Sequence, residues 1–293
     1  MELNREIITS APLPAATVVL LRDAPTGLEV FLMKRHGLSD VLGGAYVFPG
    51  GKVDAADAEL DALAHLDQPL HALHAGLNEA DISERTAGGL YVAALREAFE
   101  ESGVLFAQGD GAPDLDAARA AALLGEGHGF NAVLDQLALR LQTRSLVPWS
   151  RWITPALSSV SSKRFDTRFF VAAVPVGQVA CHDNFETTES IWLSPRSALQ
   201  QYWAGQIALA PPQIMSLAHL SHHADVHNVL AAARGRLPPL IQPEPFDQEG
   251  VRTICYPGDA RHSVREQALP GPTRLCFRNK RFEPVNGFES LFD

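Results

Sequence analysis

Three carboxylates in this chain stand at helical spacing: Glu97, Glu100 and Glu101, with Gly103 just after them. Side chains three and four residues apart are neighbours on a helix, so these acids would crowd one surface near the helix C-terminus. Like charges repel there, and the helix macrodipole disfavours anions at that end. A bound divalent cation would relieve both costs, and carboxylate oxygens suit Mg²⁺ or Mn²⁺. The run therefore predicts a metal site on a helix.

A glycine pair, Gly50-Gly51, lies upstream of the acids and is followed by Lys52. Glycine lets the backbone approach an ion closely, which a Cβ would hinder. Phe165 could stack on an adenine ring, although a core position is the commoner use of a Phe. Basic residues at the end of an expected strand and in a later segment could contact phosphate, but each also has an ordinary role in surface solubility. These candidates for substrate contact are Arg35, Lys52, Arg164 and Arg168.

The bulk composition is that of a soluble globular protein, with 293 residues, 46% of them hydrophobic and 20% charged. The formal net charge of −10 argues against non-specific binding to nucleic acid. No window approaches 18 uninterrupted apolar residues, so no transmembrane helix and no membrane partner are expected. Three scattered cysteines fit neither a disulfide framework nor a CxxC metal site, which favours a reducing cytoplasm.

Hydrophobic periodicity indicates the elements that must position these residues. The acids fall on a helix expected over Leu90–Ser102, which Gly103 would end. The stretch 55–89 has helical periodicity, and one long helix is expected over Pro211–Arg234. The expected strands are Ala16–Leu21 and Leu28–Lys34, joined by a turn, then Tyr46–Phe48, Trp152–Thr154, Arg168–Val174, Ser190–Leu193, Val251–Tyr256 and Thr273–Phe277.

The acidic run, with the glycine pair upstream, resembles the box of the Nudix hydrolase family. In that box a glycine is followed after five residues by a Glu, and after seven more by Arg-Glu-x-x-Glu-Glu-x-Gly. The second half matches here at every fixed position from Arg96 to Gly103. In the first half, Asp57 follows Gly51 after five residues, where the family has Glu, and residues 58–95 then precede Arg96. The box is therefore split by an insertion of 31 residues (38 intervening residues instead of seven), and Asp57 is given no role.

A split box is similar to that of the Nudix branch related to animal peroxisomal coenzyme A diphosphatases. Three further segments resemble that branch: Trp152–Pro155, Arg164–Phe170 and Ala210–Gln213. The resemblance implies a Nudix α/β/α sandwich with a mixed sheet. Residues 1–205 would form the Nudix domain, with a helical insertion at about 56–89, and residues 206–293 a C-terminal helix and extension packed on the same domain. The end of the chain, Ser290–Asp293, is not a peroxisomal Ser-Lys-Leu-type address, which favours a cytoplasmic protein.

The resemblance also implies residue roles. Glu97, Glu100, Glu101 and the backbone carbonyl of Gly51 would bind the metal, Mg²⁺ or Mn²⁺. Arg96 would orient a glutamate. The general base varies within the family and often lies outside the box. Two acids on an expected loop before Trp192 are candidates for it, with solvated loop acids as the alternative; they are Glu186 and Glu189.

The implied reaction is attack of a metal-activated water on a diphosphate, which yields two monophosphates. Coenzyme A or acyl-coenzyme A is the first candidate substrate, and ADP-ribose, NADH or another nucleoside diphosphate derivative is the alternative. A noncatalytic binding or regulatory module is a third interpretation, although such modules usually lose box acids. A homodimer contact through the insertion or the C-terminal segment stays open. Histidines at helical spacing could chelate a transition metal, but packing of an amphipathic helix is favoured; they are His219, His222, His223 and His227.

Overall fold

An eight-stranded mixed sheet forms the centre of the computed structural model, which describes residues 3, 7–37, 42–109, 113–158, 163–183 and 187–293. The order is β10-β7-β8-β1-β2-β3, with β4 paired to β1 and β9 paired to β2. Strand β1 is parallel to β8 and antiparallel to β2 and β4. The strands are β1 (Leu13–Ala24), β2 (Gly27–Arg35), β3 (Tyr46–Val47), β4 (Gly50–Lys52), β7 (Val147–Ile153), β8 (Phe165–Ala173), β9 (Thr187–Leu193) and β10 (Leu240–Ile241).

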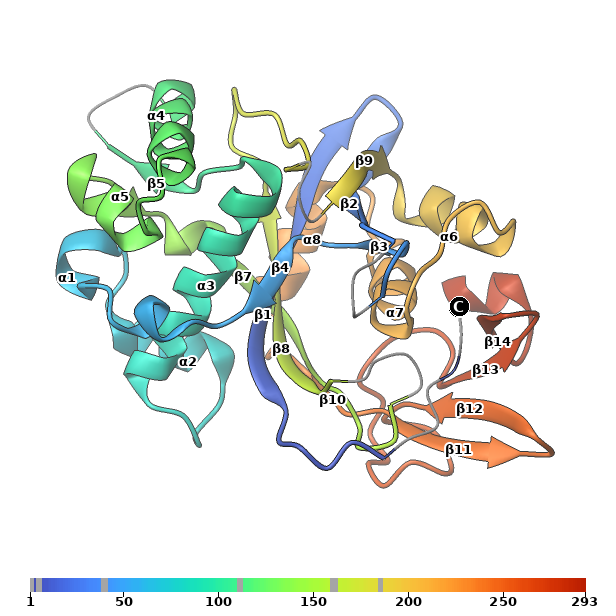
Figure 1. Cartoon of the computed structure of the whole chain (residues 1–293). Coiled ribbons are helices and arrows are strands. Elements are labelled where there is room, and N and C mark those ends of the chain that lie inside the picture. Colours follow the sequence, from blue (N-terminus) through green and yellow to red (C-terminus); the bar gives the residue numbers. More distant parts are fainter. Residues whose placement is uncertain (1–2, 4–6, 38–41, 110–112, 159–162, 184–186) are drawn as a thin grey trace.

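Helices cover both faces of this sheet (Figure 1). Because side chains alternate along a strand, Val18 and Leu20 of β1 pack with the helices on one face, and Val19 and Leu21 pack with those on the other. The predicted α/β/α sandwich is thus confirmed. The first face carries α1 (Ala62–His65), α2 (Leu70–Leu77), α3 (Glu84–Ser102), α4 (Pro113–Gly125) and α5 (Phe130–Gln136), and the second carries α6 (Pro195–Trp203), α7 (Pro211–Leu220) and α8 (Val226–Arg234). Short elements on the first side are the 3₁₀ helices Ala55–Ala58 and Thr143–Ser145 and the strands β5 (Ala107–Gln108) and β6 (Arg140–Leu141).

The acidic helix α3 begins earlier than the periodicity predicts. Ser83 caps it by accepting a hydrogen bond from the backbone N–H of Thr86 at 3.0 Å. The last residues of the insertion therefore belong to the same helix as the acids. A Cβ on Gly89 would lie 3.0 Å from the Cβ of Ala58, so this glycine lets α3 pack closely on the insertion. The helix ends as predicted at Gly103, which is left-handed with φ 69°.

The expected single helix over Pro211–Arg234 is wrong. The chain forms α7 and α8, and Asp225 starts the second helix by accepting a hydrogen bond from the N–H of Asn228 at 2.7 Å. A capping Asp competes with a continuous helical ladder, because it offers the backbone another acceptor. Periodicity alone does not register this interruption.

A four-stranded antiparallel sheet follows α8 and lies beside the α6–α7 side of the molecule (Figure 1). Two of its strands match the expected segments, and two were not predicted. Leu275 and Phe282 from this sheet belong to the same buried cluster as Val19 of the central sheet. The boundary at 205/206 stays a prediction. The strands are β11 (Glu244–Gln248), β12 (Val251–Cys255), β13 (Arg274–Arg278) and β14 (Arg281–Pro284), followed by a 3₁₀ turn over Phe288–Phe292.

No helix in the described part of the chain is both long and apolar enough to cross a bilayer.

Candidate active site

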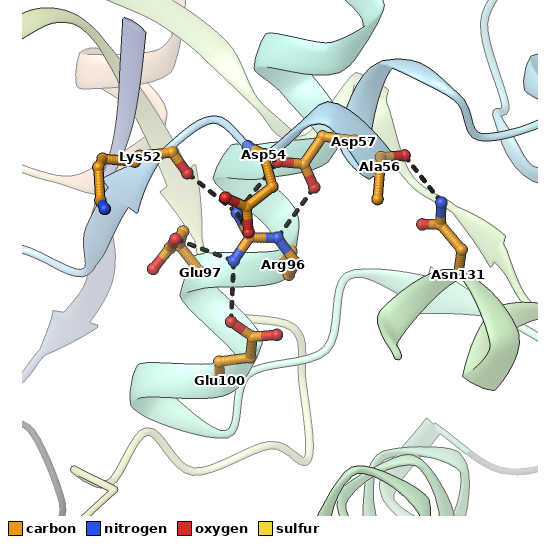
Figure 2. A network of polar contacts seen from close by, with 8 residues as sticks. All are labelled: Lys52, Asp54, Ala56, Asp57, Arg96, Glu97, Glu100 and Asn131. Atoms are coloured by element: carbon orange, nitrogen blue, oxygen red, sulfur yellow. Dashed lines mark hydrogen bonds and ion pairs between the residues drawn. The ribbon is translucent and has the colours of Figure 1, made fainter. Parts of the chain in front are cut away.

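Arg96 lies at the centre of a charged network near the end of α3 (Figure 2). Its Nε and Nη2 donate to the two carboxylate oxygens of Asp57 at 2.9 and 3.0 Å. Its Nη1 donates to Glu97 and to Glu100, each at 2.9 Å. Burial alone would lower the pKa of Arg96, but its hydrogen bonds and the three carboxylates outweigh that effect and raise the pKa. Arg96 therefore stays charged and pairs with the acids around it.

Asp57 closes the box that the insertion splits. It is 2% exposed, and its Oδ2 also accepts the backbone N–H of Asp54 at 2.8 Å. The insertion leaves the sheet after β4 and returns through α3, so the two halves of the box meet at the Asp57–Arg96 pair. This residue was given no role from the sequence alone. The available signal was its position after five residues that follow Gly51, where the Nudix box has an acid.

The glycine pair lies directly against the acids of α3. Strand β4 pairs with β1, with Gly51 opposite Ala16. The backbone N–H of Gly50 donates to Glu101 Oε2 at 2.7 Å. A Cβ built on Gly51 would lie 2.5 Å from Oε1 of Glu97, so only glycine leaves room for that carboxylate. Two acids, four residues apart on one helix face, thus meet the glycine strand.

These groups form one end of a cavity of about 750 Å³. Glu97 and Glu101 border it together with Gly50 and Gly51, whereas Glu100 does not. Burial raises the pKa of Glu100, which Arg96 opposes. Most of the remaining wall is apolar and comes from β1, β7, β8, the start of α7 and the C-terminal sheet; it includes Ala15, Trp152, Phe165, Phe169, Pro243 and Ile254.

The donors at this end suit a divalent cation. They are carboxylate oxygens and the backbone of the glycine strand. Mg²⁺ and Mn²⁺ prefer such oxygen donors over nitrogen or sulfur donors. Among the described residues, no three His, Cys, Asp or Glu side chains converge as a complete ligand set. That is compatible with Mg²⁺, which commonly takes one or two carboxylates and completes its shell with water and substrate phosphates. The residues present therefore fit the ion that the acidic run predicts.

Three of the predicted substrate-contact residues border the cavity: Arg35, Lys52 and Phe165. Two further basic side chains border it as well, His36 and Lys163. These two were missed from the sequence, although His36 directly follows Arg35 and Lys163 lies just before the predicted segment Arg164–Phe170. Cationic groups thus border the same cavity as the acids.

The other two predicted contacts do not border the cavity. Arg164 donates to the backbone carbonyls of Thr154 and Ser10 at 2.9 and 3.2 Å. Arg168 is 5% exposed and pairs with Glu79 of the insertion and with Asp166. Side chains alternate along β8, so Arg168 lies on the opposite face of the sheet from Phe165. These two arginines therefore make contacts within the protein and do not line the cavity.

Glu189 lies within β9 and not on the loop expected from the sequence. It is opposite Lys34 in the sheet, whose Nζ lies 3.4 Å from its Oε2, and it does not border the cavity. Burial, with the nearby Glu189, raises the pKa of Tyr46 to about 12. Glu186, the other proposed base, lies outside the described residues.

The histidine pair His219 and His223 packs instead of building a metal site. The ring of His219 lies 4.4 Å from that of Trp149. Burial and the nearby Arg236 lower the pKa of His219 to about 3, so the ring is neutral near pH 7. The two histidine rings are 6.0 Å apart, and no third ligand joins them among the described residues. Packing is therefore favoured over metal binding, although His223 lies between α7 and α8 and not on one continuous helix.

Comparisons with known proteins agree with this geometry. The family domain described as "NUDT19 Nudix domain" matches residues 7–220. The acyl-coenzyme A diphosphatase NUDT19 of Xenopus laevis is 28% identical over 69% of this chain and 62% of its own length. The human protein of that name is 28% identical over 72% of this chain and 65% of its own length. The chain thus spans less than two thirds of these two relatives.

A solved structure shows the same fold. The crystal structure of a Nudix hydrolase from Alicyclobacillus acidocaldarius has a TM-score of 0.61 and 27% sequence identity to this chain. The match covers 78% of this chain and 98% of that one. The split box, the glycine strand beside Glu97 and Glu101, and the family match over residues 7–220 lead to one conclusion. The chain belongs to the Nudix hydrolases, in the family described as the NUDT19 Nudix domain.

Proposed function

We propose that this protein hydrolyses the diphosphate linkage of coenzyme A or acyl-coenzyme A, using Mg²⁺ or Mn²⁺. The observation that carries the proposal is the cavity of about 750 Å³ that is bordered both by Glu97, Glu101 and the glycine pair and by many apolar side chains. A diphosphate needs the first feature, and a pantetheine or acyl chain suits the second. Relatives named acyl-coenzyme A diphosphatase support the same substrate class.

Nudix hydrolases generally use divalent metal ions, and Glu97, Glu101 and the carbonyl of Gly51 are the groups that would hold one here. When bound, the ion supplies charge for the diphosphate oxygens and a water of lowered pKa. The chain's own contribution is to fix the two carboxylates. Arg96 holds Glu97 from one side, and the N–H of Gly50 holds Glu101. Glu100 shares the guanidinium with Glu97, which favours a positioning role for it over direct metal contact.

Basic side chains on the cavity wall would bind phosphate groups. Arg35, His36, Lys52 and Lys163 all border the cavity. Coenzyme A carries a 3′-phosphate in addition to its diphosphate, so it presents more negative charge than ADP-ribose does. Several cations around one cavity therefore favour the more highly charged substrate. Phe165 borders the same cavity and is the aromatic candidate for stacking on adenine.

The apolar wall supports the choice between substrate classes. Trp152 and Phe169 of the central sheet and Ile254 of the C-terminal sheet border the cavity. Ile254 lies beyond residues 7–220, so the C-terminal extension adds to the wall that the Nudix domain provides. A ribose or a second nucleotide is polar and would gain little from such a wall. An aliphatic arm gains free energy when it leaves water and packs against this wall.

The direct test is a substrate panel with purified protein and Mg²⁺. Coenzyme A, an acyl-coenzyme A, ADP-ribose, NADH and diadenosine polyphosphates are compared by product chromatography. We expect coenzyme A or its acyl ester to give 3′,5′-ADP and a 4′-phosphopantetheine product. If coenzyme A and its ester are spared while another diphosphate is cut, the substrate proposal is wrong. If nothing is cut with Mg²⁺ or in a parallel panel with Mn²⁺, the result supports the noncatalytic alternative.

Matched variants test which acids act. Glu97→Gln and Glu101→Gln change carboxylates that border the cavity, and Glu189→Gln changes one that does not. Removing several kcal/mol of electrostatic stabilisation lowers the rate by about 100-fold or more, so we expect that loss for the first two variants. The third should keep nearly full kcat. An equal loss for Glu189→Gln would restore its candidacy as the general base.

Metal removal tests the ion. EDTA should abolish turnover, and added Mg²⁺ or Mn²⁺ should restore it. The circular dichroism spectrum should not change, because both buried clusters consist of apolar side chains and do not depend on the acidic end of the cavity. Turnover that persists in EDTA would rule out a metal-dependent mechanism.

A further inference from the structure

Gln213 is a buried amide on the wall of the cavity. The residue is part of the lining and is 7% exposed. Its Oε1 is buried and accepts no hydrogen bond from any residue that the structure describes. Buried side-chain oxygens in native proteins are almost always paired with a donor. A donor that is not among the described residues is therefore expected to pair with this oxygen, and a ligand in the cavity would supply one.

The same residue stands at the N-terminus of α7. The helix opens with Pro211 and Pro212, neither of which has an N–H, and no side chain caps it. Gln213 therefore carries the first backbone N–H of the helix, and the next one, on Ile214, bonds to the carbonyl of Ala210 at 3.0 Å. Residues 210–213 all border the cavity. Gln213 thus combines two features. It stands at an uncapped helix end, which favours a hydrogen-bond acceptor, and it carries a buried oxygen, which needs a donor.

These two features select the chemistry of the ligand. An ionised phosphate or carboxylate only accepts hydrogen bonds, so it could pair with the N–H₂ of the Gln213 amide but would leave Oε1 unpaired. An amide offers an N–H donor and a carbonyl acceptor within one neutral group. Pro212 precedes Gln213 on the cavity wall and Trp152 borders the same cavity, and such apolar groups suit a neutral arm better than a phosphate. The pantetheine arm of coenzyme A carries two such amides.

We propose that Gln213, together with the N-terminus of α7, hydrogen-bonds an amide of the substrate's pantetheine arm and so selects substrates that carry one. This inference rests on the function proposed above, because coenzyme A derivatives are the diphosphates with such an arm. Gln213 acts on specificity and affinity and not on the chemical step. Ribose hydroxyls can also donate and accept, so the test must separate the two kinds of arm.

The test measures binding of two small monophosphates to the Mg²⁺-loaded protein by calorimetry. One is 4′-phosphopantetheine, which has amides, and the other is ribose 5-phosphate, which has only hydroxyls. The variant Gln213→Leu keeps the size of the side chain and removes its hydrogen bonds. We expect its Kd for 4′-phosphopantetheine to rise about three- to tenfold, as for loss of one neutral hydrogen bond, and its Kd for ribose 5-phosphate to change less than about twofold.

Ser216 supplies the matched control. It lies on the same helix, and its buried Oγ also lacks a partner among the described residues, but it does not border the cavity. Ser216→Ala should leave both affinities unchanged. Thermal melting checks that each variant is folded, and Gln213→Asn, which retracts the amide by one methylene, replaces Gln213→Leu if that variant does not fold. The Asn variant should also weaken 4′-phosphopantetheine selectively.

The inference is overturned if the wild-type protein has no measurable affinity for 4′-phosphopantetheine. It is also overturned if the Gln213 variant weakens both ligands alike, weakens only ribose 5-phosphate, or changes neither. Failure of the proposed function looks different. In that case coenzyme A is not cleaved, while binding of 4′-phosphopantetheine still depends on Gln213.

Discussion

Replacing Gly51 by Ala tests whether the glycine strand places a catalytic carboxylate. The new Cβ would lie 2.5–2.6 Å from the three carboxyl atoms of Glu97, whereas ordinary contacts begin at 3.4 Å. The carboxylate must therefore retreat by about 1 Å. A displacement of that size at a reacting centre can cost about 100-fold in rate, so kcat/KM for coenzyme A should fall by roughly that factor. The concentration of Mg²⁺ needed for half-maximal activity should rise.

Stability should change little in the same variant, which separates the effect from unfolding. The φ of Gly51 lies outside the left-handed range, so alanine can adopt this backbone. The atoms that must move are the end of a flexible side chain. Alanine also lowers the entropy of the unfolded chain, which offsets about 0.4–1 kcal/mol of the strain. The melting temperature should therefore stay within a few degrees of the wild type.

Gly37→Ala is the matched control, because a Cβ there meets no atom of the described residues within 4 Å and the backbone is again outside the left-handed range. It should keep wild-type activity. The assay compares kcat/KM, the Mg²⁺ titration and the melting curve for all three proteins. A folded Gly51→Ala enzyme that keeps kcat/KM within threefold of the wild type would refute the placement of Glu97 at the reacting centre.

Three further predictions concern stability and pH. Asp57→Ala leaves the buried Arg96 without its paired carboxylate and should lower the free energy of unfolding by about 3–5 kcal/mol in urea titrations. The side chain of Asp54 is 69% exposed, so Asp54→Ala should lower it by less than about 1 kcal/mol. Arg168→Met should also destabilise the fold but leave KM for coenzyme A unchanged; a raised KM would return Arg168 to the substrate contacts. The pKa of His219 is about 3 in the folded protein, against an ordinary value of 6.5, so between these pH values the unfolded chain binds a proton that the folded chain does not. The free energy of unfolding should therefore fall as the pH is lowered from 6.5 towards 3. This group contributes a decrease of up to about 1.4 kcal/mol per pH unit. His219→Gln should flatten that dependence in urea titrations at pH 4 to 7, and an unchanged slope would contradict the assignment.

Much of the fold followed from local patterns. The hairpin of β1 and β2 and the helix that ends at Gly103 rest on alternation, helical period and glycine chemistry, which act over a few residues. The interruption between α7 and α8 was missed, because the apolar period continues across it while Asp225 starts a new helix. Strands β11 and β14 were missed because they form by pairing with strands that the periodicity did indicate.

The sequence by itself determined the chemistry of the acidic run, because the spacing of Glu97, Glu100 and Glu101 is a property of one helix. Only the tertiary structure decided which of these acids meet the cavity. Because β4 packs against α3, Glu97 and Glu101 border the cavity, whereas Glu100 accepts a hydrogen bond from Arg96 and does not border it. Tertiary structure also brought Asp57 to Arg96, since that contact joins groups on either side of the insertion. A helical period fixes neighbours along one helix, whereas contacts between elements depend on how the whole chain packs.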